Sequence, residues 1–65
     1  MGADEMNSFE LTQRNIEEFS RVQSWMETLD KETTTYRAMY VRYRELKIIL
    51  ASSGINMAEL DVIKG

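Results

Sequence analysis

Apolar residues recur every three or four positions from Ile16 to Leu29, with polar residues between them. This spacing places them along one side of an α-helix. Acidic and basic residues also stand four apart in the order that stabilises a helix. These pairs are Glu10 with Arg14, Glu17 with Arg21, and Glu27 with Lys31. We therefore expect a helix over residues 8–31.

The residues before this helix carry a capping pattern. Asn7 can accept a hydrogen bond from the first turn, while Glu10 can reach back to the backbone of Asn7. Met6 and Leu11 have the spacing of a hydrophobic staple. We expect residues 1–6 to form a flexible tail and residues 7–65 to form a single helical domain.

A second apolar pattern covers residues 34–52 and ends at a helix stop signal. Gly54 can adopt a left-handed backbone conformation, and Ile55 can fold back on Leu50. Asn56 is then placed to cap a short last helix over residues 57–64. So short a helix is unstable alone, so we expect it to dock on the rest of the chain. The docking residues would be Met57, Leu60 and Ile63.

The junction between the two long segments has two interpretations. Thr33, Thr34 and Thr35 are β-branched and disfavour a helix interior, whereas Thr33 is a good N-cap, which favours a turn. The three-four apolar spacing nevertheless continues through them, which favours one long coiled-coil helix over residues 8–52.

A turn would bring opposite charges together, Arg37 near Glu27 and both Arg44 and Lys47 near Glu17 and Glu18. The favoured fold is therefore all-α, an antiparallel helical hairpin plus a short C-terminal helix, assembling as a dimeric helical bundle.

The second helix is too apolar for one neighbour to cover. Val41 and Ile48 project from nearly the opposite side to the main stripe, and a surface helix normally carries a single stripe. We expect self-association, most simply as a homodimer. The predicted interface is Tyr36, Met39, Tyr43, Leu46 and Leu50, with Trp25 at or near the contact. In the alternative, the last helix covers this surface in a monomeric three-helix bundle.

The amino-acid composition excludes most kinds of catalytic site. The chain has no cysteine and no histidine, so it lacks disulfides, thiolate ligands, and the commonest general base and metal ligand. Glu17 and Glu18 point about 100° apart on a helix and do not converge on one ion. We expect no enzyme activity, no metal, no cofactor and no small-molecule substrate.

Charge bears on the choice of partner. The net charge is −3, with −5 on residues 1–32 and +2 on residues 33–65, which argues against a general nucleic-acid binder. One face of the second helix could still contact nucleic acid or another anion, through Arg37, Tyr40, Arg44 and Lys47. No apolar run approaches the 20 or so residues that span a bilayer, so we expect a cytoplasmic protein that does not enter membranes.

The small size, the acidic start and the helix–turn–helix–cap layout resemble those of many short phage or mobile-element proteins. The resemblance implies a small regulator or inhibitor that binds a host protein complex, or a minor assembly protein. The residues themselves predict a non-enzymatic protein–protein interaction or assembly module that binds itself and an unidentified protein partner. A nucleic-acid-associated regulator is the alternative.

Overall fold

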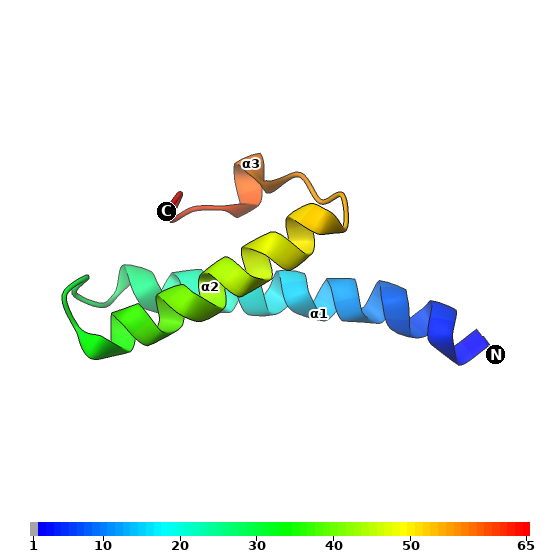
Figure 1. Cartoon of the computed structure of the whole chain (residues 1–65), viewed down its shortest axis with the longest axis horizontal. Helices are drawn as coiled ribbons and strands as arrows, with labels where there is room; N and C mark the ends of the chain where they lie inside the picture. Colours follow the sequence, from blue (N-terminus) through cyan, green and yellow to red (C-terminus); the bar gives the residue numbers. More distant parts are fainter. Residues whose placement is uncertain (1) are drawn as a thin grey trace.

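The computed structural model describes the backbone of residues 2–65 and the side chains of residues 9–65. It contains helices α1 (Gly2–Glu27), α2 (Thr34–Ser52) and α3 (Met57–Leu60). α1 and α2 form an antiparallel hairpin, and the chain after α2 returns along it through α3 (Figure 1). The predicted all-α hairpin with a short C-terminal helix is confirmed, and the single long helix over residues 8–52 is wrong.

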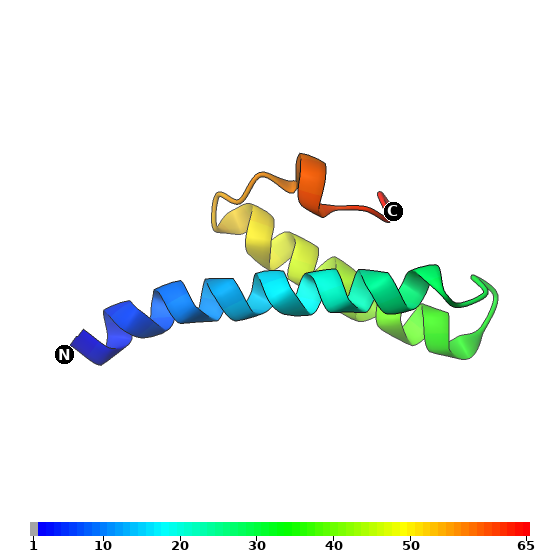
Figure 2. The same ribbon diagram turned by 180° about the vertical axis from the view of Figure 1, so that it is seen from behind.

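The N-terminal part of α1 extends past the end of α2 (Figures 1 and 2). The helix begins at Gly2 and continues through Asn7, so the start predicted at residue 8 is wrong. Acidic residues near a helix N-terminus are favoured by the helix dipole, and no proline interrupts this stretch. The backbone of residues 2–6 is helical where a flexible tail was expected, while the side chains of residues 1–8, and with them the predicted Met6–Leu11 staple, lie outside the described residues.

The turn between α1 and α2 is built from side chains that compete for backbone groups. Thr28 donates from Oγ1 to the carbonyl of Trp25 at 2.7 Å, and Asp30 accepts from the N–H of Glu32 at 3.1 Å. α1 therefore ends at Glu27 and not at the predicted residue 31. Thr33 caps α2 as predicted, its Oγ1 accepting from the N–H of Tyr36 at 3.1 Å.

The end of α2 also follows the predicted pattern. Gly54 has a φ of +84°, and the N–H of Ile55 donates to the carbonyl of Leu50 at 3.1 Å. Asn56 then caps α3 by accepting from the N–H of Ala58 at 2.9 Å. α3 is shorter than the predicted helix over residues 57–64, because the backbone after Asp61 bonds to α1 instead of continuing its own helix.

The core lies between the two long helices, where Phe19 and Tyr43 stack with ring centroids 5.4 Å apart. The residues that follow α2 pack on the edge of this core, as predicted for the docked C-terminal segment. The fully or nearly fully buried core residues are Phe19, Val22, Met26, Tyr43, Leu46 and Leu50, and the segment contributes Ile55, Met57, Leu60 and Ile63.

Candidate interaction surfaces

The stripe predicted for self-association is mostly the core of a single chain. Tyr43, Leu46 and Leu50 have no exposed surface, while Tyr36 and Met39 are half-buried against them. The prediction misplaced these five side chains because helical spacing shows which residues share a face but does not show what covers that face. In this structure the cover comes from α1 and the chain after α2.

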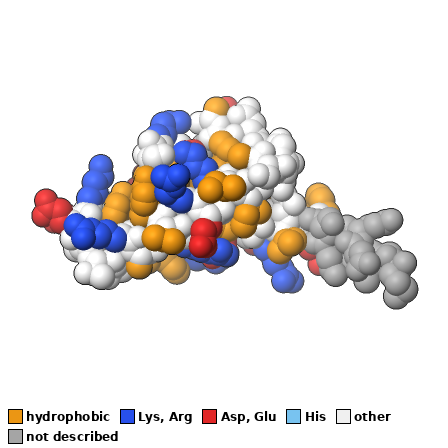
Figure 3. Space-filling model, in the orientation of Figure 1, with side chains coloured by type: hydrophobic (Ala, Val, Ile, Leu, Met, Phe, Trp, Pro, Cys, Tyr) orange, Lys and Arg blue, Asp and Glu red, His pale blue; other side chains and the backbone are white. Residues whose placement is uncertain are grey.

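Exposed apolar side chains remain on the other side of α2. Val41 and Ile48 are each 60% exposed, and the neighbouring Ile49 is 42% exposed. We call these three residues the outer apolar face. Val41 and Ile48 are seven residues apart and so lie one above the other on the helix. Figure 3 shows hydrophobic side chains mixed with Lys and Arg on the face of the molecule that it draws.

The outer apolar face also carries charge. Glu45 stands four residues after Val41 and three before Ile48, and its side chain binds Arg42 at 3.2 Å. Arg44 is exposed beside it and makes no ion pair with any described residue. The surface therefore presents apolar side chains beside one acidic residue that is already paired, Glu45, and one basic residue that is not, Arg44.

The predicted anion-binding face is divided by the fold. Tyr40 stacks between Tyr36 and Tyr43, with centroid distances of 6.4 and 5.4 Å. Lys47 forms a salt bridge with Asp61 at 2.8 Å and lies 5.6 Å above the ring of Tyr43. Of the four residues of this face, only Arg37 and Arg44 are exposed basic residues that form no ion pair with another described residue.

The ion pair that joins the two long helices differs from those predicted. Arg42 donates to both carboxylate oxygens of Glu18, at 2.8 and 2.9 Å. These hydrogen bonds hold the pKa of Glu18 below its ordinary value and raise that of Arg42. The predicted pairs of Arg37 with Glu27, and of Arg44 and Lys47 with Glu17 and Glu18, do not form, because Glu18 pairs with Arg42 and Lys47 pairs with Asp61. Both members of the observed pair are over one-third exposed, so its contribution is about 0.2–1 kcal/mol.

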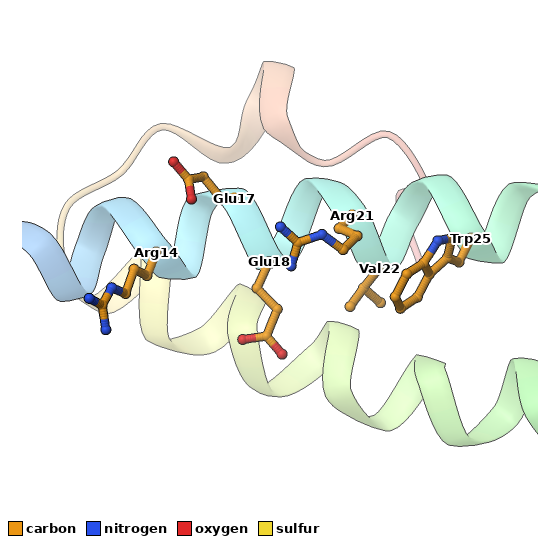
Figure 4. A pocket seen from close by; sticks show the side chains of 6 residues that line it. All are labelled: Arg14, Glu17, Glu18, Arg21, Val22 and Trp25. Carbon is orange, nitrogen blue, oxygen red and sulfur yellow. The ribbon is translucent and has the colours of Figure 1, made fainter.

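Trp25 lies apart from the outer apolar face, on the flank of α1. It is 51% exposed and borders a surface hollow of about 520 Å³. Figure 4 shows Trp25 and Val22 beside one another, with Glu18 pointing toward α2. The other residues that line the hollow are Arg14, Glu17 and Arg21. Acids and bases are both present, so the hollow is not selective for an anion.

A buried polar cluster, which the sequence interpretation missed, holds the end of the chain. We call Gln23, Tyr43, Lys47 and Asp61 the C-terminal clamp. Gln23 is 3% exposed and makes three hydrogen bonds to the backbone of residues 60–63. Asp61 is 6% exposed and accepts from Tyr43 at 2.6 Å. The only hint in the sequence was Gln23 itself, a polar residue between Phe19 and Met26 at the spacing of the buried stripe.

The clamp sets the ionisation of its members. Burial would raise the pKa of Asp61, but hydrogen bonds from Lys47, Tyr43 and the N–H of Lys64 outweigh it and lower that pKa. Burial, and then the bond to Asp61, raises the pKa of the Tyr43 hydroxyl. The bond to Asp61 likewise raises the pKa of Lys47. At neutral pH the clamp thus holds a carboxylate, an ammonium and a neutral phenol.

No protein-family model, curated protein or solved structure matches this chain. Within the part of the chain that the structure describes, no group of three carboxylates is placed to hold a metal ion. Over the same residues, none of the helices combines the length and apolar character needed to cross a membrane.

Proposed function

We propose that this protein is a non-enzymatic assembly module that self-associates through the outer apolar face of α2. The observation that carries the proposal is the 60% exposure of both Val41 and Ile48 on a helix whose Tyr43, Leu46 and Leu50 are fully buried. Large apolar side chains scattered singly over a surface are ordinary. Val41 and Ile48, two turns apart on one helix with Ile49 beside Ile48, form an apolar seam, interrupted by Arg44 and Glu45, that a second helix can cover.

Charge on this face suits a second copy of the same chain. In a two-fold dimer each patch meets its own copy, so the patch must be complementary to itself. Two antiparallel copies of α2 can place Ile48 of one copy over Val41 of the other. The same arrangement brings the free Arg44 of each copy toward Glu45 of the other. The apolar contact provides the free energy of association, and the charge pairs determine that the two α2 helices run antiparallel.

Analytical ultracentrifugation of matched variants tests the proposal. Ile48→Asp places a charge in the centre of the seam and should give a monomer. Leu11→Asp is the control, because Leu11 is 59% exposed and lies on α1, away from the outer apolar face of α2. The control should associate like the unmodified chain, and equal behaviour of the two variants would contradict the proposed surface.

A second candidate function rests on that extended part of α1. Phe9 and Leu11, near the start of α1, are 74% and 59% exposed, and Glu10 between them forms no ion pair with any described residue. An acidic helix with exposed apolar groups suits a basic groove on another protein, as expected of a small inhibitor of a host complex. Titration with a cationic amphipathic peptide should shift the NMR signals of this part of α1. Shifts confined to α2 would rule it out.

A further inference from the structure

The flank of α1 that carries Trp25 has the features of an interaction surface separate from the outer apolar face of α2. Its hollow of about 520 Å³ is lined by residues of α1, the first of them Arg14 and the last Trp25. These positions are about three turns, or roughly 16 Å, apart along the helix axis. Small-molecule sites are concave and enclose most of their ligand. A hollow that lies open along three turns of one helix suits the side of a second helix instead.

Trp25 gives this surface an apolar anchor point. Its side chain is 51% exposed, so neither α2 nor the C-terminal segment covers it. It lies beside Val22, which is only 6% exposed and joins the indole to the core (Figure 4). Tryptophan is enriched among the residues that contribute most to binding at protein interfaces. A large apolar side chain of a partner can therefore pack on the exposed part of the indole.

The charges along this flank are not balanced. Glu18 is already bonded to Arg42 through both carboxylate oxygens, and Glu17 lies on the opposite edge of α1 from Glu18 (Figure 4). Arg14 and Arg21 are exposed and form no ion pair with any described residue. A free anion in the hollow would meet acids as well as bases, but a segment that follows the Glu18 edge of α1 meets two unpaired guanidinium groups.

We propose that this hollow binds an acidic amphipathic helix of another protein, which packs one large apolar side chain on Trp25 and pairs two carboxylates with Arg21 and Arg14. Arginine binds carboxylates through two parallel hydrogen bonds. Arg21 and Arg14 are four and eleven residues from Trp25. Because two helices have the same rise per residue, the partner carries its apolar residue and its two acids at matching spacings. The proposal concerns α1 and does not rest on self-association through α2.

The fluorescence of Trp25 tests the proposal directly, because it is the one tryptophan of the chain. The probes are alanine-based helical peptides without tryptophan. Each carries one leucine and two glutamates, the glutamates four and eleven residues from the leucine to match Arg21 and Arg14. One peptide has the leucine before the glutamates and another has it after them, so both directions of the helix are covered. Binding should shift the emission of Trp25 to shorter wavelength, and lysines replace the glutamates in the control peptides.

Charge reversal on α1 gives the matched variants. Arg14→Glu combined with Arg21→Glu turns two attractions into repulsions, so the dissociation constant should rise about tenfold or more. Arg14→Gln with Arg21→Gln adds no charge and should raise it by a smaller factor, and circular dichroism checks that both variants keep their helix content. Arg37→Glu is the control, since Arg37 is exposed and unpaired among the described residues but lies on α2. It should bind like the unmodified chain.

Each outcome decides for or against this partner. Binding of a glutamate peptide that is weaker with lysines, and weaker in the Arg14 and Arg21 variants than in Arg37→Glu, supports it. Equal binding of the lysine peptides, or no emission shift up to the solubility limit of the glutamate peptides, overturns it. A shift to shorter wavelength as the chain alone is concentrated would mean that a second copy covers Trp25, which also overturns it. The Ile48→Asp chain should bind the peptide unchanged, so failure of self-association through α2 would not affect this result.

Discussion

The hydroxyl of Tyr43 donates to Oδ1 of Asp61 at 2.6 Å inside the fold, joining the middle of α2 to the chain that follows α3. The same carboxylate binds Lys47 and the N–H of Lys64. A buried carboxylate is stable as an anion only with such partners. The buried carboxylate of Asp61 therefore ties the C-terminal segment to the core face of α2.

Stability should fall in acid through Asp61. Its pKa in the folded chain is lower than the ordinary value of about 3.9, so its contribution is present above pH 4 and is lost as pH falls toward the lower folded pKa. Glu18, whose pKa is also lowered, acts in the same direction. Urea unfolding at pH 7 and pH 3 should show a smaller difference for Asp61→Asn than for the unmodified chain. An equal difference would mean that Asp61 does not carry this dependence.

Gln23→Leu should destabilise the fold by about 1–3 kcal/mol, because it leaves the backbone groups of residues 60–63 buried without partners. Thermal or urea unfolding followed by circular dichroism measures the change. Gln13→Leu is the matched control, since Gln13 is exposed on the same helix and should change stability by less than about 0.5 kcal/mol. Equal effects of the two substitutions would contradict a clamping role for Gln23.

Nucleic-acid binding should be weak, because Lys47 is already paired with Asp61 and only Arg37 and Arg44 remain free on that face. Two phosphate contacts give a slope of log affinity against log salt no steeper than about −2. Fluorescence anisotropy with mixed DNA or RNA at several salt concentrations measures it. A markedly steeper slope would show that more basic groups contact phosphates. It would support the predicted nucleic-acid contact through Arg37, Tyr40, Arg44 and Lys47.

Features that depend on near neighbours in the chain could be predicted. The caps at Thr33 and Asn56 and the turn at Gly54 involve bonds over two to five residues, and each formed as expected. Asp61 and Gln23 escaped notice because the partners that matter most lie far away in the sequence, up to 40 residues for Gln23. Helical periodicity does not fix how two helices rotate against one another, so Arg42, and not Arg44 or Lys47, met Glu18.

The same reasoning explains the error in the predicted interface. Spacing correctly separated the stripe through Tyr43 from the opposite side with Val41 and Ile48, but it could not show which side the rest of the chain would cover. The core residues of α1 and the C-terminal segment together bury the first. The second stayed exposed, so the apolar excess predicted for α2 persists on different residues.

Sedimentation equilibrium of the unmodified full-length chain, over a concentration series at neutral pH, tests the central claim most directly. The chain has a mass of 7.6 kDa. Self-association through α2 predicts that the weight-average mass rises with concentration toward twice that value. A mass that stays at the single-chain value through the micromolar range and up to the highest soluble concentration would contradict it.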